Sequence, residues 1–167
     1  MERVMIIGCG GAGKSTLAKK LGEKTGLPVV HLDHIWWAPG NWEHLSREEF
    51  DVRLAVAMEK DRWIMDGNFN RTLDVRLERA DTVLYLDFPR WLCLWGWIGR
   101  VLKNWGRARE DMAPGCSEWF DPEMARWIWN FNKQNRQRYL EKLKDWNGEV
   151  HILHNRRQVR QFLEQLK

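Results

Sequence analysis

Short apolar runs alternate with longer amphipathic segments along this chain of 167 residues. The apolar runs are rich in valine, isoleucine and leucine, and each is followed by glycine or by polar turn residues. This arrangement is typical of buried strands in a parallel sheet. We therefore expect strands at residues 4–7, 28–32, 63–65, 82–86 and 150–153.

Start signals for helices stand between the expected strands. Residues 46–49 (SREE) match a capping box that opens a helix to about residue 60. Asp121 precedes Pro122 at the start of a long helix to about residue 145, and Asn155 can cap a last helix. Further helices are expected after the first glycines, at 73–79 and at 90–104. Alternating strands and helices predict an α/β fold of three α-β-α layers with a five-stranded parallel sheet.

Composition narrows the class of protein. Hydrophobic residues make up 44% and charged residues 30%, which is typical of a globular domain and not of a disordered, coiled-coil or membrane-spanning chain. Three widely separated cysteines exclude a disulfide scaffold and indicate a reducing, cytoplasmic compartment. No repeat or linker divides the sequence, so we expect one domain over residues 1–167. The net charge of +4 gives a mild preference for anionic partners, and twelve tryptophans are far more than usual.

Residues 8–15 (GCGGAGKS) match the phosphate-loop pattern GxxxxGK[ST] without a mismatch, between an expected strand and an expected helix. Glycines allow successive backbone N–H groups to point at phosphate oxygens, next to a helix N-terminus. A lysine here can bridge the β- and γ-phosphates of ATP, and the next serine can bind Mg²⁺. The residues predicted to bind ATP are Gly8, Gly10, Gly11, Ala12, Gly13, Lys14, Ser15 and Thr16.

Polar residues follow the other expected strands. They are Asp33 and His34, residues 66–68 (DGN), Asp87, and residues 154–155 (HN). The carboxyl ends of parallel strands meet at one edge of the sheet, where ligands of such folds bind. Asp and Asn also begin turns, which is the structural alternative for each of them.

The chain resembles the nucleoside-monophosphate-kinase-like group of small P-loop kinases, which includes adenylate, shikimate and gluconate kinases, over nearly its whole length. Residues 63–69 (WIMDGNF) are similar to the Asp-Gly strand of adenylate kinases, which implies that Asp66 orients waters on Mg²⁺. In that group an arginine soon after the glycine holds the acceptor phosphate. The nearest arginine here is Arg71, one position later than in the adenylate kinase pattern. The Gly99-Arg100 pair is similar to the start of the adenylate kinase lid, where the arginine contacts the transferring phosphate.

A closer resemblance is to adenylate-kinase-related proteins that are labelled DNA topology modulation proteins, a label that comes from a phenotype. No groove-reading helix or zinc finger is recognisable in the sequence. The matching segments are 8–16 (GCGGAGKST), 31–34 (HLDH) with a following tryptophan, 66–69 (DGNF), 86–90 (LDFPR) and 109–111 (RED), with Cys116 and Glu118.

A basic segment follows the fourth expected strand, with five basic residues and no acidic residue from Arg90 to Arg109. Phosphoryl transfer needs positive charge around the transferring group, and a mobile lid can deliver it while excluding water. We expect a short helical lid at about 104–120, with Arg100, Arg107 and Arg109 as catalytic residues. A solvated basic face or a nucleic-acid patch is the alternative.

Several other residues are candidates for the acceptor side. Shikimate-kinase-like enzymes place an acid at the position of Asp33, which could accept the proton of an acceptor hydroxyl; a turn or helix cap is the alternative. Asp87 is either a partner of the magnesium site or a turn residue. Trp36, Trp37 and Trp42 are expected to contribute to the acceptor pocket, and a tryptophan beside Gly96 could stack on the base. The remaining tryptophans are expected to pack.

The sequence thus predicts a cytoplasmic small-molecule kinase that uses ATP and Mg²⁺, with Ser15 and Asp66 at the metal. The acceptor is left open among a nucleotide, a nucleoside and a small alcohol. The alternative is a nucleotide-binding regulator that hydrolyses ATP and associates with nucleic acid, which the modest net charge does not favour. No membrane partner is expected.

Overall fold

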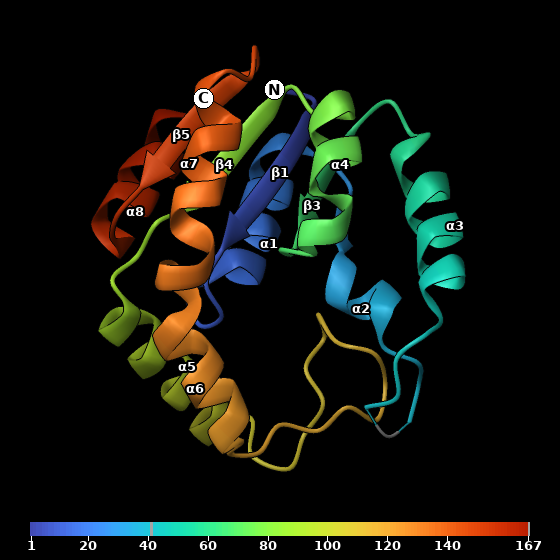
Figure 1. The fold of residues 1–167 in the computed structure, drawn as a ribbon, viewed down its shortest axis with the longest axis vertical. Helices are drawn as coiled ribbons and strands as arrows, with labels where there is room; N and C mark the ends of the chain where they lie inside the picture. The colour runs from blue at the N-terminus through green and yellow to red at the C-terminus, as the bar shows by residue number, and fades with distance from the viewer. Residues whose placement is uncertain (41, 167) are drawn as a thin grey trace.

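The structure, a computed structural model, describes residues 1–40 and 42–166. Within these residues five strands form one parallel sheet in the order β2-β3-β1-β4-β5. Val4 of the central strand pairs with Ile64 on one side and Thr82 on the other. The predicted five-stranded parallel sheet is confirmed (Figure 1). The strands are β1 (Arg3–Gly8), β2 (Val29–His31), β3 (Trp63–Asp66), β4 (Thr82–Leu86) and β5 (Glu149–Leu153).

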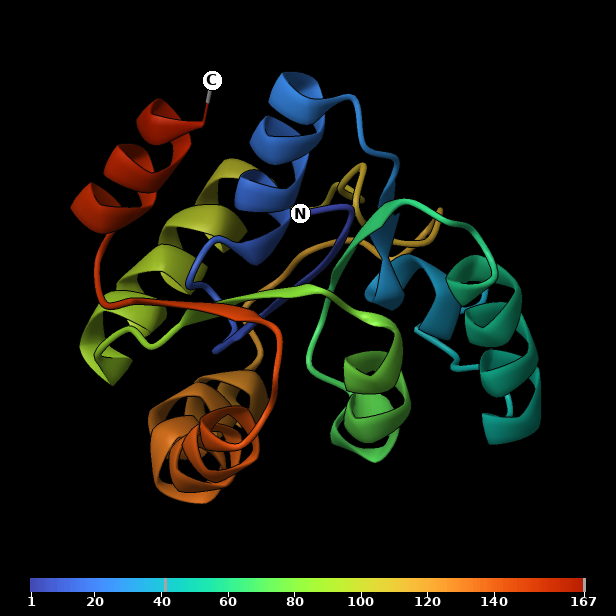
Figure 2. The same cartoon turned by 90° about the horizontal axis from the view of Figure 1, so that it is seen from above.

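Helices cover both faces of the sheet, so the predicted three-layer arrangement is also confirmed. Figure 2 shows α1 and α8 on one face and α4, α6 and α7 on the other. No helix in the described ranges is both long and apolar enough to cross a bilayer. The helices are α1 (Lys14–Thr25), α2 (Leu32–Trp36), α3 (Arg47–Met58), α4 (Leu73–Arg79), α5 (Arg90–Lys103), α6 (Pro122–Phe131), α7 (Gln137–Lys144) and α8 (Arg156–Gln165).

The predicted helix starts are present as side-chain caps. Ser46 Oγ accepts a hydrogen bond from the backbone N–H of Glu49, which completes the capping box. Asp121 and Asn155 cap α6 and α8 in the same way. Such a cap satisfies backbone donors that the first helical turn leaves without partners.

The long helix predicted to about residue 145 is not uniform. A π-helical segment, Asn132–Arg136, separates α6 from α7. In this segment the buried Asn135 accepts a hydrogen bond from Asn70 Nδ2 at 2.7 Å and donates one to the Phe131 carbonyl at 3.1 Å. The inserted turn therefore brings a polar side chain against the segment that follows β3.

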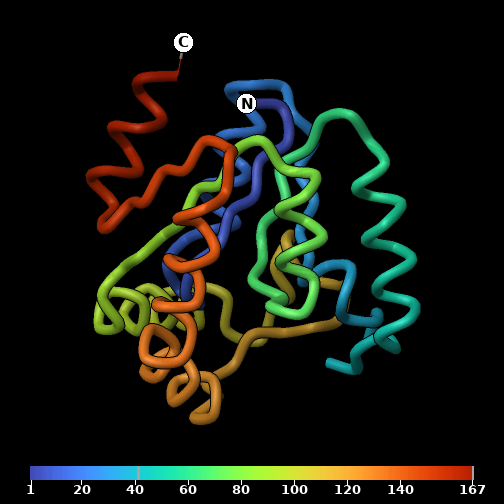
Figure 3. The backbone as a smooth tube through the Cα atoms, turned by 45° about the horizontal axis from the view of Figure 1, so that its top comes forward, coloured from blue at the N-terminus to red at the C-terminus, as the bar shows by residue number. Residues whose placement is uncertain are grey.

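The segment between α5 and α6 runs from the end of α5 to the neighbourhood of α2 and back, as the tube in Figure 3 shows. Gly40 N donates to the Pro114 carbonyl at 2.8 Å, and Trp42 Nε1 donates to the Ser117 carbonyl at 3.1 Å. The prediction of a helical lid is wrong, because this segment consists of turns and isolated bridges. A proline and a left-handed Gly115 (φ 87°), packed against Gly40, are incompatible with a continuous helix here.

Candidate active site

The phosphate loop connects β1 to α1 and is fixed by close packing against α5. A Cβ atom on Gly11 would lie 2.1 Å from the Cys93 carbonyl oxygen, and one on Gly96 would lie 2.2 Å from the Gly11 carbonyl oxygen. Neither approach is possible for a residue with a side chain. These two glycines therefore allow α5 to hold the loop at backbone contact distance.

Two further hydrogen bonds shape the loop. Lys14 Nζ donates to the carbonyls of Gly8 and Cys9 at 3.0 and 3.1 Å, so the ammonium group lies within the curve of the loop. The backbone N–H of Gly8 donates to Asn68 Oδ1 at 3.0 Å. The amide of Asn68 thereby joins the phosphate loop to the turn that follows β3.

A cavity of about 760 Å³ opens over the loop at the carboxyl ends of the strands. Of the eight residues predicted to bind ATP, all but Gly8 line it. The opposite wall comes from elements that are distant in sequence: α2, the turn after β3, the lid segment, α6 and α8. The residues that line it include Gly10–Thr16, Lys20, Asp33, Gly67–Phe69, Gly96, Arg100, Arg109, Met124, Trp127, Arg156 and Arg160.

Asp33 lies on this wall in the first turn of the short helix α2. The N-cap of α2 is His31, which forms no side-chain cap hydrogen bond, and Asp33 lines the cavity. Burial raises the pKa of Asp33, and the negative charges of Asp66 and Asp111 add to this effect, while Lys14 and Arg109 oppose it.

Asp66 forms a close pair with His31 behind the cavity wall. Its Oδ1 lies 2.5 Å from His31 Nδ1, and only 4% of the residue is exposed. Burial lowers the pKa of His31, but the hydrogen bond and charge of Asp66 outweigh burial, and the net pKa is raised. The second histidine of the HxxH spacing, His34, is exposed.

The oxygen donors at the loop fit Mg²⁺ that enters with phosphate groups. Ser15 and Asp33 line the cavity, and Asp66 and Asp111 are close enough to contribute to the raised pKa of Asp33. Hard oxygen ligands are those that Mg²⁺ prefers. Among the described residues, no group of three or more His, Cys, Asp or Glu side chains forms a ready metal site.

Two of the three predicted lid arginines reach the cavity, and they share one carboxylate. Arg109 Nε donates to Glu118 Oε1 at 2.7 Å, and Arg100 Nε lies 3.2 Å from the same oxygen. Glu118 is 3% exposed. Burial and the charge of Arg109 lower the pKa of Arg100. The placement of Arg107 was predicted wrongly, because its side chain is exposed and does not line the cavity.

Sequence reasoning missed the basic side chains of the β5 side of the cavity. Lys20 of α1 and Arg156 and Arg160 of α8 line it. A Cβ atom on Gly96 would lie 3.1 Å from Arg156 Nη2, so this guanidinium covers the space that Gly96 leaves open. The spacing of Arg156 and Arg160, one helical turn apart after a capped start, is the signal that could have identified them.

The tryptophans are placed differently from the prediction. Trp95 is 67% exposed and Trp97 is buried in the core, so neither tryptophan beside Gly96 lines the cavity, whereas Trp127 of α6 does. Trp37 and Trp42 pack against Met112, Ala113 and Cys116 of the lid segment. Trp36 lines a separate pocket of about 230 Å³. None of these three tryptophans lines the cavity over the phosphate loop, and Trp36 faces the turn after β3 across the smaller pocket; the contribution of these rings to acceptor binding stays a prediction.

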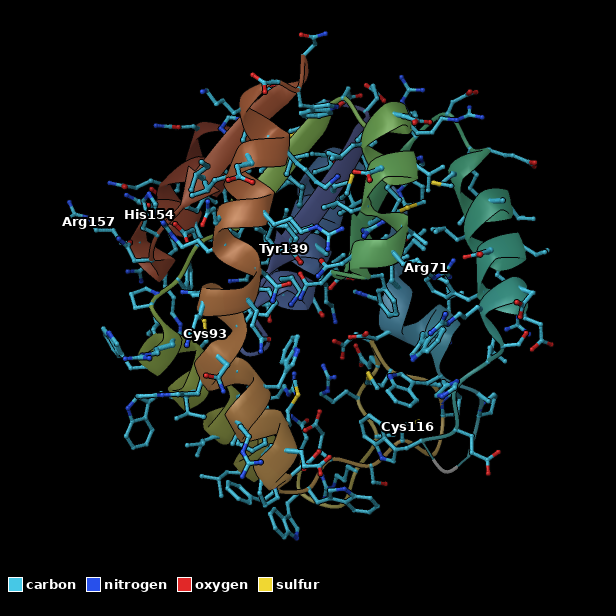
Figure 4. The ribbon with its side chains drawn as sticks, in the orientation of Figure 1. Arg71, Cys93, Cys116, Tyr139, His154 and Arg157 are labelled. Atoms are coloured by element: carbon cyan, nitrogen blue, oxygen red, sulfur yellow. The ribbon has the colours of Figure 1, made fainter. Side chains whose placement is uncertain are left out.

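Asp87, at the end of β4, belongs to an ion-pair network on the side of the molecule where β5 meets α8. Arg136 Nε binds its carboxylate at 2.9 Å, and His154 Nδ1 lies 3.5 Å from its other oxygen. Figure 4 shows His154 at the left of the molecule, beside α8. Asp87 does not line the cavity, and its carboxylate is engaged by Arg136 and His154.

Comparison with known proteins supports a kinase fold. The chain is 27% identical over 110 residues to an adenylate kinase from Clavibacter michiganensis subsp. michiganensis, an alignment that covers 64% of this chain and 53% of that protein. The chain thus spans about half the length of this curated relative. No family model matches it.

Solved structures agree with the topology. Shikimate kinase from Acinetobacter baumannii, in complex with shikimate, superposes with a TM-score of 0.59 at 17% identity over 99% of this chain and 90% of that chain. Shikimate kinase from Aquifex aeolicus gives a TM-score of 0.57 at 16% identity over 98% and 92%. The chain therefore has the fold of the P-loop kinases and is similar in sequence to an adenylate kinase.

Proposed function

We propose that this protein is an ATP- and Mg²⁺-dependent phosphotransferase that transfers the γ-phosphoryl group to a hydroxyl of a small molecule. One observation carries the proposal: the phosphate loop and the Asp33 carboxylate face one cavity, with Arg100 and Arg109 on its wall. The names of the relatives, adenylate kinase and shikimate kinase, support the same reaction class. The shared segments described above support kinship with the DNA topology modulation group as part of this proposal.

Each group at the cavity has a role in this reaction. The loop N–H groups and Lys14 bind the phosphates, and Arg100 and Arg109 stabilise the charge of the transferring group. Ser15 and Asp66 would hold Mg²⁺, which supplies further neutralisation of phosphate charge when bound. Asp33 accepts the proton of the acceptor hydroxyl while the acceptor oxygen forms a bond to the γ-phosphorus of ATP. The bond between the γ-phosphorus and the β-γ bridging oxygen breaks, and ADP is released.

The lid segment and the cysteines extend this proposal. Contacts of the lid with Gly40 and Trp42 hold it over the acceptor side, where it would limit hydrolysis of ATP by water. Cys9, Cys93 and Cys116 are buried free thiols. Thiols that form no disulfide are typical of proteins in the reducing cytoplasm, and we propose that this protein is cytoplasmic.

Acceptor-dependent release of ADP tests the proposal. Lys14→Ala should lower this rate by more than about 100-fold, because a charge that stabilises the transition state is lost. Lys60→Ala removes an exposed lysine far from the loop and should leave the rate unchanged. Full phosphoryl transfer by Lys14→Ala would refute the mechanism. ADP release independent of acceptor, together with steeply salt-dependent DNA binding, would favour the regulatory alternative.

A further inference from the structure

We infer that the acceptor of this kinase is a hydroxyl compound that carries no phosphate or carboxylate group. The inference rests on the proposed function and adds the chemical class of the acceptor. It depends on which carboxylates and carbonyls of the protein bind the arginines near the acceptor side, and on which other side chains line that part of the cavity.

The two arginines that follow the β3 turn are both bound by the protein itself. Arg71 forms a bidentate pair with Asp51 of α3, with N–O distances of 2.7 and 2.6 Å. Figure 4 shows Arg71 on the side of the turn that faces α3, and it does not line the main cavity. Arg76 is completely buried and donates to four backbone carbonyls, those of Gly67, Asn68, Phe69 and Thr72. The Arg76 guanidinium is therefore unavailable to an acceptor anion, and Arg71 is engaged by Asp51 outside the main cavity, beside a smaller pocket.

The lid arginines are balanced by carboxylates. Arg100 and Arg109 share Glu118, and Arg109 Nη1 also binds Asp111 Oδ2 at 2.5 Å. Two positive charges are thus matched by two negative charges before any ligand binds. During transfer the γ-phosphoryl group needs the same two arginines, which leaves no excess positive charge for a second anion.

The rest of the acceptor wall is anionic or uncharged. Asp33 lines it with Asn68 and Phe69 of the turn after β3, and Met124 and Trp127 of α6 line the cavity beside Gly10. Apart from Lys14 of the loop, Arg100 and Arg109 are the only basic side chains that line this half of the main cavity among the described residues; Arg47 and Arg71 line the smaller neighbouring pocket. A carboxylate, an amide and an aromatic ring on this wall suit an apolar ring face with hydroxyl groups, as in a nucleoside or a sugar.

The opposite half of the cavity has the reverse charge. Lys20, Arg156 and Arg160 line it beside the phosphate loop, and no acidic residue does so among the described residues. The strand order separates the halves, because β5 and α8 lie at one edge of the sheet and β2 and α2 at the other. An anionic ligand is therefore favoured on the β5 side and disfavoured on the β2 side.

Matched acceptors that differ in charge test this inference with the full chain and Mg-ATP. One comparison sets ribonucleosides against their 5′-monophosphates, and the other sets glucose and glucosamine against glucuronate. For each compound, kcat/KM is measured from the release of ADP above that of a control without acceptor. The member without an anionic group should be preferred by about tenfold or more, and added salt should narrow the difference. An equal or greater kcat/KM for the anionic members overturns the inference while the proposed function stands. Transfer to no member, with Mg-ATP bound, refutes both.

Two variants probe the electrostatic cause. Asp111→Asn removes one carboxylate beside Arg109 and should narrow the preference for the uncharged member by at least about threefold. Glu110→Gln is the matched control, since this neighbour points outward to Lys19 and its side chain is 91% exposed. The preference is a ratio of two acceptors on one variant, so a general loss of activity does not affect it. An unchanged ratio in Asp111→Asn would overturn the charge argument.

Discussion

Arg76 is the residue on which the acceptor turn depends most. Its guanidinium donates to the carbonyls of Gly67 at 3.0 Å, Phe69 at 3.2 Å and Thr72 at 3.2 Å, and also to that of Asn68. The turn itself is strained, since Phe69 has a φ of 35° without being glycine. The Arg76 guanidinium binds the carbonyls of this turn and so stabilises its strained backbone. Replacing Arg76 should therefore lower the free energy of unfolding and disturb the part of the cavity wall that the turn forms.

The size of the effect follows from these contacts. A hydrogen bond from a charged group contributes about 1.5–3 kcal/mol, so four give about 6–12 kcal/mol. Burial opposes this, because it lowers the pKa of Arg76 to about 10, which corresponds to roughly 3 kcal/mol. In a variant without the guanidinium, the turn after β3 can relax so that water hydrates some of these carbonyls, which makes the loss of stability smaller. We therefore expect Arg76→Met to lower the free energy of unfolding by about 3–5 kcal/mol.

Urea unfolding followed by far-UV circular dichroism measures this loss. Arg76→Lys keeps the charge with fewer donors and should lose about 1–3 kcal/mol. Arg79→Met, at the exposed end of the same helix, should stay within about 0.5 kcal/mol of the parent protein. A loss of less than about 1 kcal/mol in Arg76→Met would show that other donors satisfy these carbonyls, and the reasoning would fail.

Two further variants test the loop and the proposed base. Gly96→Ala should weaken the binding of Mg-ATP, measured by calorimetry, by more than about tenfold, because the added Cβ would press on the Gly11 carbonyl. Gly99→Ala is the control, because open space surrounds the position of its Cβ. This variant should bind Mg-ATP normally, and its free energy of unfolding should rise by up to about 1 kcal/mol. Equal binding by both would refute the packing argument. Asp33→Asn should lower kcat by about 100-fold or more. Because burial raises the pKa of Asp33, its contribution to stability is present below pH 3.8 and lost as the pH rises through the folded-state pKa. Asp33→Asn should therefore be more stable than the parent at neutral pH, with a difference that closes below pH 3.8; greater stability of the parent at neutral pH would contradict this.

Features with contiguous signals were predictable from the sequence. The bounds expected for α4 and β4 are those observed, and the phosphate loop needs only eight adjacent residues to be recognised. The helix caps at Ser46 and Asp121 were also predictable, because a cap is a local interaction. The prediction of Asp33 as a cavity residue depended on one further rule, that strand ends share an edge.

Features that depend on distant contacts were not predictable. Arg71 lies one position after that of the acceptor-binding arginine in the adenylate kinase pattern, and its guanidinium binds Asp51, twenty residues earlier. The lid lacks a helix because its backbone follows Gly40 and Trp42, which no local pattern reveals. Arg107 and Arg109 look equivalent in sequence, and only the position of Glu118 distinguishes the one that enters the cavity.

In the proposed kinase, the charges around the cavity would keep the two ligands of one small domain apart. The phosphate loop follows the central strand, so either edge of the sheet could receive ATP. Basic residues of α1 and α8 make the β5 edge attractive to polyphosphate, whereas Asp33 on α2 makes the β2 edge unattractive to it. The direction of transfer is then set by side chains outside the loop. A similar loop and sheet can therefore serve anionic or neutral acceptors, depending on whether the arginines after β3 face the cavity or, as here, bind Asp51 and the backbone.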